Sequence, residues 1–217
     1  MRTNSSAYAH RSGMIMRLAI LGTGNVAQTL ARRLSETGHE VTFGSRDPAS
    51  KAGLNAPVTS LADAVAGNDV VINATPGAAS LEVIKRIGAA AFAGKVLVDV
   101  ANANTPSFEL VYPNSSLGEK LQAALPDAKV VKTMNTAAMA VMTEAAGLPP
   151  SSVFVSGDDA GAKATVASLL AGLGWPDDSI VDLGGIVSAR GTEHYFLLFA
   201  ALMQSLGSPK FNIRLVT

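Results

Sequence analysis

A glycine-rich turn near the start of the chain has the residue types and spacing to bind a phosphate group. It reads G-x-G-x-x-A, with Gly22, Gly24 and Ala27 at the small positions. Gly22 allows a tight turn, Gly24 lets a pyrophosphate approach the backbone, and Ala27 lets the following helix lie close to the strand. The helix start offers unpaired N–H groups and the positive dipole end to phosphates. We therefore predict a dinucleotide site formed by Gly22, Thr23, Gly24, Asn25 and Val26.

The end of the next apolar run indicates which dinucleotide is bound. NAD-binding proteins place Asp or Glu there, about 20 residues on, to bind the ribose hydroxyls. Here Gly44 takes the expected acidic position and Ser45 and Arg46 follow. A hydroxyl and a guanidinium suit a 2′-phosphate, because Arg donates two hydrogen bonds to one phosphate. This predicts NADP(H). The alternative is an ordinary surface turn, and Lys51 either adds charge near the phosphate or is simply solvated.

Three later apolar runs end in small or amide-bearing residues, at 73–77, 100–104 and 133–136. In open α/β sheets, ligands bind at the carboxyl ends of the strands. Such ends let a flat nicotinamide lie against the backbone, with amides available for its carboxamide. Each residue alone is more often a cap or turn residue. Together they predict one cleft that contains Ala74, Thr75, Pro76, Asn102 and Asn135.

The elements that must position these residues alternate along the chain. Nearly continuous apolar runs, as expected of parallel strands buried on both faces, are Arg17–Leu21, Glu40–Phe43, Asp69–Asn73, Lys95–Val100, Lys129–Lys132, Ser152–Val155 and Ile180–Asp182. Helix-like stretches between them are Asn25–Glu36, Leu61–Ala66, Ala79–Ala91, Ser116–Leu125, Ala160–Leu173 and Ser188–Leu206. This order predicts an α/β, Rossmann-like, doubly wound and mostly parallel sheet with a small C-terminal helical and strand extension.

We expect three parts along the 217 residues. Residues 1–15 form a disordered arm, or precede a start at Met14 or Met16; residues 16–155 form the NADP-binding Rossmann domain; residues 156–217 form an extension on the same sheet. The last long helix repeats apolar residues at i, i+3 and i+4 spacing. It either covers the sheet or contributes to a subunit interface. The residues of this stripe are Tyr195, Leu198, Phe199, Leu202 and Leu206.

Composition excludes several classes of function. With 17 basic and 17 acidic side chains the net charge is 0, without the basic excess of a nucleic-acid binder. The absence of Cys excludes disulfides, thiolate metal sites and a catalytic thiol, and three scattered His residues do not suggest a zinc site. No apolar run approaches the ~20 residues of a membrane span, and no secretory signal is evident. We expect a cytoplasmic protein without metal, nucleic-acid or membrane partners.

The strand ends carry no evident general acid or base. We find no Ser–His–Asp set, no paired carboxylates and no Lys-centred cluster there, and we place His39 and His194 away from the cleft. Oxidising an alcohol normally needs such a group, so we assign no catalytic residue. Hydride transfer between two planar heterocycles asks mainly that the rings be aligned.

The runs Gly22–Val26, Gly38–Val41 and Gly44–Pro48 resemble those of NADPH-dependent deazaflavin reductases, which reduce 8-hydroxy-5-deazaflavin. The cytosolic domains of transmembrane ferric reductases look similar. The resemblance extends to the C-terminus through Val130–Thr136, Val153–Asp159 and Ser188–Arg190. It implies a Rossmann domain with a small extension, usually a homodimer.

The resemblance also implies roles for individual residues. It places Thr23, Ser45 and Arg46 on NADP and Ala74–Pro76 beside the nicotinamide, with a planar acceptor near Asn135, Thr136 and the loop after Val100. The chain departs from the family at Ala27, where a third Gly is usual, and in the segment 135–139. We therefore expect the acceptor to be a deazaflavin or a flavin-type molecule, with a quinone or another electron acceptor as alternatives. The alternatives are an imine or short carbonyl reductase related to pyrroline-carboxylate reductases, and a non-catalytic NADP-binding sensor or subunit.

Overall fold

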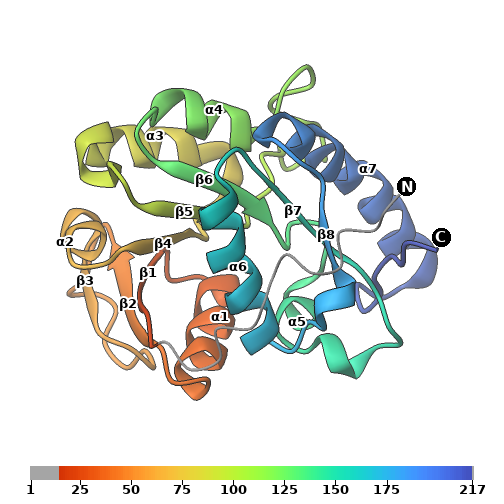
Figure 1. Cartoon of the computed structure of the whole chain (residues 1–217), viewed down its shortest axis with the longest axis horizontal. Coiled ribbons are helices and arrows are strands. Elements are labelled where there is room, and N and C mark those ends of the chain that lie inside the picture. Colours follow the sequence, from red (N-terminus) through yellow and green to blue (C-terminus); the bar gives the residue numbers. More distant parts are fainter. Residues whose placement is uncertain (1–14, 217) are drawn as a thin grey trace.

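A computed structural model describes residues 15–216, apart from the side chain at position 146. The predicted arm over 1–15 therefore lies, except for Ile15, outside the described residues. One eight-stranded sheet runs through the molecule in the order β3-β2-β1-β4-β5-β6-β7-β8 (Figure 1). Its strands are β1 Arg17–Leu21, β2 Glu40–Ser45, β3 Val58–Ser60, β4 Val70–Asn73, β5 Val96–Asp99, β6 Lys129–Thr133, β7 Val153–Gly157 and β8 Ile180–Asp182.

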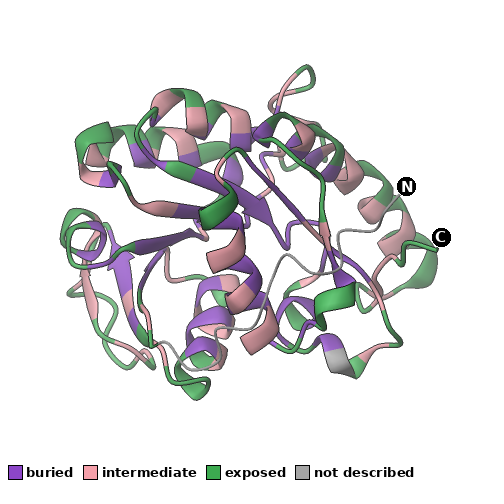
Figure 2. Cartoon of the chain, in the orientation of Figure 1, coloured by how far each residue is buried: buried purple, intermediate pink, exposed green. Residues whose placement is uncertain are grey.

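Helices cover both faces of this sheet (Figure 1). They are α1 Asn25–Glu36, α2 Leu61–Ala66, α3 Gly77–Ile87, α4 Leu117–Ala124, α5 Met139–Thr143, α6 Ala160–Gly172 and α7 Ala189–Leu206, with 3-10 turns at Ala89–Phe92, Ala145–Gly147, Asp177–Ser179 and Ile186–Ser188. One core contains the apolar faces of α1 and α6, and the other contains those of α2 and α4. Figure 2 shows the strands buried between these two layers.

The sheet is parallel except where β7 runs antiparallel to β6. Strand order reverses between β1 and β4, which are parallel neighbours in register from Leu18–Val70 to Leu21–Asn73. Such a switch point opens a crevice at the carboxyl ends of the strands. The predicted α/β, Rossmann-like and mostly parallel fold is confirmed. The predicted domain boundary at residue 155 falls inside β7, so the sheet itself continues across it.

Some predicted elements differ from the observed ones. The edge strand β3 and the short helix α5 are absent from the predicted elements. The helix predicted over Ala79–Ala91 begins two residues earlier and ends at Ile87, because Gly88 has a φ of 95°, outside the helical region. The prediction that the apolar stripe on α7 covers the sheet is wrong for two of its residues, since Leu198 and Leu206 are 54% and 60% exposed.

In the part of the chain that the structure describes, no helix is long and apolar enough to cross a membrane.

Candidate active site

The glycine-rich turn lies at the switch point, held between the ends of β2 and β4. Gly22 donates its N–H to the carbonyl of Gly44 at 3.0 Å, and Ala74 donates to the carbonyl of Leu21 at 3.0 Å. Gly22 has a φ of 106°, and a Cβ there would stand 2.8 Å from the carbonyl oxygen of Ala74. Only glycine satisfies both conditions. The predicted turn residues thus come together at the carboxyl edge of the sheet.

The surface in front of helix α1 is open. A Cβ on Gly24 would have no heavy atom within 4 Å, and this residue caps α1 without a side-chain hydrogen bond. Gly24 and Asn25 are exposed, and Gln28 donates from Nε2 to the carbonyl of Thr23 at 2.8 Å. A small residue before an exposed helix start fits a pyrophosphate.

The end of β2 is followed by the exposed cation Arg46 and the exposed carboxylate Asp47. The strand extends through Ser45, two residues further than predicted. A Cβ on Gly44 would stand 2.8 Å from Cδ2 of Leu21 and 3.2 Å from Cβ of Ala64, so an acidic side chain there would crowd two buried apolar side chains. Ser45 Oγ accepts from the backbone N–H of Asp47 at 3.1 Å. Arg46 and Lys51 are exposed, and no carboxylate within residues 15–216 forms an ion pair with either.

A cleft of about 270 Å³ adjoins this turn. From the predicted site it contains Val26, Ala74, Thr75, Asn102 and Asn135, whereas Pro76 is exposed and caps α3. The opposite wall was not predicted and comes from α5 and α7. Its residues are Ala137, Ala138, Met139, Met142, Phe196 and Phe199. The spacing of Phe196 and Phe199 on one face of the last helix was the available signal.

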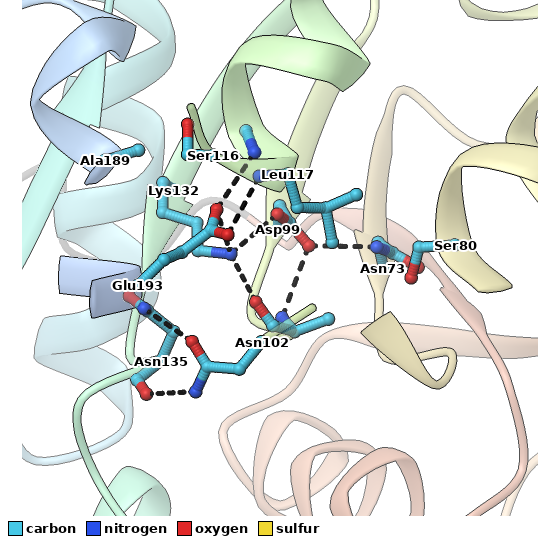
Figure 3. A network of polar contacts seen from close by, with 12 residues as sticks. Asn73, Ser80, Asp99, Asn102, Ser116, Leu117, Lys132, Asn135, Ala189 and Glu193 are labelled. Carbon is cyan, nitrogen blue, oxygen red and sulfur yellow. Dashed lines mark hydrogen bonds and ion pairs between the residues drawn. The ribbon is translucent and has the colours of Figure 1, made fainter. Parts of the chain in front are cut away.

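The two predicted amides, which follow the neighbouring strands β5 and β6, bind each other at one side of the cleft (Figure 3). Asn102 donates from Nδ2 to the backbone carbonyl of Asn135 at 2.7 Å, and Asn135 donates from Nδ2 to Oδ1 of Asn102 at 2.9 Å. Asn135 follows Met134, a buried residue with a φ of 58°. A non-glycine residue in that region costs on the order of 1–3 kcal/mol, so its surroundings must hold it there. The turn fixes Asn135 against Asn102.

Four phenylalanine rings form a row beside the cleft. Phe108, in the loop after β5, stacks on Phe196 with centroids 5.9 Å apart, and Phe196 and Phe199 are 6.5 Å apart. Phe211, in the segment after α7, stacks on Phe199 at 5.0 Å. Such offset rings add roughly 0.5–1.5 kcal/mol per pair beyond burial. The row gives the cleft an aromatic wall.

Our expectation that no Lys-centred cluster stands at a strand end is wrong. Lys132, near the end of β6, is fully buried with Nζ 2.8 Å from Asp99 Oδ2 and 3.0 Å from Glu193 Oε1 (Figure 3). It also donates to the carbonyl of Ala101. Burial alone would lower the pKa of Lys132, but the negative charges of Asp99 and then Glu193 outweigh this effect and raise it. The cluster is therefore charged, and it lies behind the cleft rather than in it.

Comparisons with known proteins agree with this geometry. A family model described as NADP oxidoreductase, coenzyme F420-dependent, matches residues 17–103. The F420-dependent NADP reductase of Methanocaldococcus jannaschii is 30% identical over 176 residues, which cover 71% of this chain and 78% of that protein. The crystal structure of a suggested F420-dependent NADP reductase from Arthrobacter sp. FB24 is 40% identical, with a TM-score of 0.87, and covers 93% of this chain and all of that one.

The metalloreductase STEAP3 of Rattus norvegicus is 32% identical over 185 residues. The match covers 82% of this chain but only 36% of the rat protein, so the chain spans about a third of that relative's length. Fold, glycine turn and switch-point cleft together define a dinucleotide-binding protein of the Rossmann class. Within that class, the chain belongs to the family of coenzyme F420-dependent NADP oxidoreductases. The prediction of an NADP oxidoreductase is confirmed at the level of the family.

Proposed function

We propose that this protein binds NADP(H) and catalyses hydride transfer between its nicotinamide and a planar deazaflavin or flavin-type acceptor. The observation that carries this proposal is the composition of the cleft. Of the described residues that line it, none has an ionisable side chain. Hydride transfer to a carbonyl or imine carbon calls for a general acid, whereas transfer between two flat rings calls for alignment at contact distance.

The chain's own residues would hold the dinucleotide along the switch point. The exposed start of α1 faces the pyrophosphate, and Arg46 with Ser45 faces the 2′-phosphate at the end of β2. Ala74 and Thr75 line the cleft where the nicotinamide would lie. When bound, NADPH would supply the hydride. The residues of this chain would bind and orient the dinucleotide and exclude water from the cleft.

The acceptor side of the cleft supports a flat, apolar molecule. Phe196, Phe199, Met139 and Met142 form a wall opposite Ala74. Aromatic and thioether side chains pack well against planar heterocycles. The name of the M. jannaschii relative includes F420, which favours a deazaflavin for this chain. The rat relative is named a metalloreductase and its name does not include F420, so we keep a flavin-type acceptor beside the deazaflavin in the proposal.

Label transfer tests this function directly. NADPH deuterated stereospecifically at C4 is mixed in parallel with a deazaflavin, with FMN and with a short aldehyde or cyclic imine. We expect deuterium to be retained in the reduced deazaflavin, where it is bound to carbon. With FMN as acceptor we expect loss of the C4 label from NADPH together with FMN reduction, because deuterium on a ring nitrogen exchanges with water. Label that appears only in a carbonyl or imine product would contradict the proposal in favour of a carbonyl or imine reductase. Tight NADPH binding with no transfer to any acceptor would indicate a non-catalytic NADP-binding subunit.

We also propose that the protein is a homodimer that associates through the outer face of α7. Leu198 and Leu206, two residues of the predicted stripe, are 54% and 60% exposed on this helix. Apolar side chains clustered on one surface commonly mark an association site.

A further inference from the structure

The cluster around Lys132 ties together the elements that form the two walls of the cleft. Asp99 ends β5, Lys132 lies in β6 and Glu193 lies in the first turns of α7. All three side chains are buried. Figure 3 shows them converging behind Asn102, with dashed contacts leading from the cluster to the cleft.

On the strand side, the cluster holds the backbone that carries the predicted nicotinamide contacts. Asp99 Oδ1 accepts from the N–H of Ala101 at 3.2 Å and from Nδ2 of Asn73 at 2.9 Å. Asn73 Oδ1 in turn accepts from the hydroxyl of Thr75 at 2.7 Å. Because Lys132 also donates to the carbonyl of Ala101, both polar groups of the residue before Asn102 are held.

On the helix side, the cluster fixes the start of α7. Glu193 Oε2 accepts from the N–H of Leu117 at 2.8 Å, and its Oε1 accepts from the N–H of Gly118 at 3.0 Å. These donors belong to the first turn of α4 and have no partner within their own helix. Phe196 lies one turn beyond Glu193 on α7 and lines the cleft. The same carboxylate therefore contacts Lys132 and anchors the aromatic wall.

We propose that Lys132 and Glu193 are positioning residues that hold Asn102 and Phe196 at the separation a flat acceptor needs to lie on the nicotinamide. This inference rests on the proposed hydride transfer. Buried ion pairs are poor sources of stability, because well-packed apolar residues often do as well. Directional bonds to defined atoms do fix geometry, and a site misplaced by about 1 Å loses up to ~10²-fold in rate.

The test uses Glu193→Gln, which keeps the side-chain volume but replaces one acceptor oxygen with an NH2 group, which donates and cannot accept. A second variant, Lys132→Met/Asp99→Asn/Glu193→Gln, removes all three charges so that none is left buried and unpaired. The matched control is Lys163→Met. Lys163 is also largely buried and pairs with Asp182 at 2.8 Å, but it belongs to α6 and does not line the cleft.

Three quantities are measured for each full-length variant: the Kd for NADPH, the kcat with the best planar acceptor, and amide hydrogen exchange of the free protein. In both cluster variants we expect a kcat about tenfold lower, in line with a sub-ångström displacement, and an NADPH Kd within about twofold of wild type. Exchange should accelerate over 101–105. Lys163→Met should lower the melting temperature while leaving kcat and exchange over 101–105 unchanged.

A purely structural role would lower the melting temperature of the cluster variants without changing kcat per folded molecule or exchange over 101–105, and that result would overturn the proposal. The failure of the proposed function looks different, because wild type itself would then transfer no hydride. Exchange of the free protein still decides in that case. Faster amide exchange over residues 101–105 in Glu193→Gln than in wild type, with no change in Lys163→Met, supports positioning. Equal exchange over these residues in wild type, Glu193→Gln and Lys163→Met contradicts it.

Discussion

At the scale of single residues, the proposed preference for NADP(H) rests on one exposed cation. Arg46 lies two residues after Gly44, which takes the position where NAD-binding proteins carry a carboxylate, and a side chain at position 44 would crowd Leu21 and Ala64. We expect Arg46→Ala to remove a charged hydrogen bond of about 1.5–3 kcal/mol. NADPH affinity should then fall roughly tenfold or more, while NADH affinity stays the same. Titration calorimetry with both dinucleotides measures this.

Arg86→Ala is the control for that experiment, because Arg86 is an exposed arginine in the last turn of α3, at the opposite end of that helix from the cleft. Equal loss of NADPH and NADH affinity in Arg46→Ala would contradict a 2′-phosphate contact.

Substitutions at the two glycines of the turn should have different effects: one should block cofactor binding and the other should destabilise the fold. A side chain at Gly24 meets open space, so Gly24→Val should keep the melting temperature of the free protein but block the pyrophosphate. Gly22→Ala should destabilise the fold, because it combines a φ of 106° with a Cβ 2.8 Å from a carbonyl oxygen. In thermal unfolding, saturating NADPH stabilises wild type by about 2.7 kcal/mol at 100 times Kd. A Gly24→Val protein that showed the same shift would place the dinucleotide elsewhere.

The sequence predicts some residues of the site better than others for a physical reason. The glycine turn is a local pattern, because its turn, phosphate and packing requirements fall on adjacent positions. Lys132 reads as an ordinary polar residue closing an apolar run, and its partners Asp99 and Glu193 are distant in sequence. Only the order of the strands and the path of α7 bring them together. Phe196 was missed in the same way.

At the scale of elements, an ion pair joins α4 to α7. Arg190 donates to both carboxylate oxygens of Glu119, at 2.8 and 2.6 Å. These hydrogen bonds hold the pKa of Glu119 at about 2, against an ordinary value of 4.5. A lowered carboxyl pKa stabilises the fold above the unfolded value and loses that effect as pH falls through the folded one. Arg190→Met should therefore be less stable than wild type at neutral pH, with the difference shrinking between pH 4.5 and 2.

Urea unfolding at several pH values measures this difference. Arg32→Met serves as a control, since Arg32 pairs with Glu36 within one exposed helix turn, at 3.2 Å, where such pairs contribute little. A gap between Arg190→Met and wild type that stayed constant down to pH 2 would contradict the assignment to Glu119.

The segment after α7 supports the aromatic wall from behind. Ser152 donates its N–H to the carbonyl of Ile213 at 2.8 Å, and Leu215 donates to Ser152 Oγ at 3.0 Å. This attachment holds the segment that carries Phe211, whose ring stacks on that of Phe199. We expect Phe211→Ala to raise the KM for a planar acceptor severalfold, because the ring of Phe199 loses its stacking partner. The Kd for NADPH should be unchanged. Steady-state kinetics separates the two, and a change in NADPH affinity alone would contradict this role.

The helices and strands that could be predicted from the sequence are those whose own residues carry a pattern, whereas the missed ones depend on distant parts of the chain. The buried strands and the amphipathic helix α1 were predicted from their own residues, because burial on both faces or on one face leaves a pattern. The strand β3 and helix α5 hold only three and five residues. Segments that short carry too few residues for a period to show. They form because β2 and α1 offer them something to pack against.

At the scale of the whole molecule, a substitution on the outer face of α7 tests whether the protein is a monomer or the proposed dimer. A twofold dimer brings the same surface of each copy together, so one substitution alters both sides of the interface. Leu198→Glu would place two like charges at the proposed contact between α7 and its own copy. We expect wild type to run as a dimer in light scattering coupled to size-exclusion chromatography, and Leu198→Glu to run as a monomer.

The control for this experiment is Ile15→Glu, at an exposed apolar residue before β1, which should remain dimeric. A wild-type protein that is monomeric at every concentration tested, or a Leu198→Glu variant that stays dimeric, would contradict this assembly.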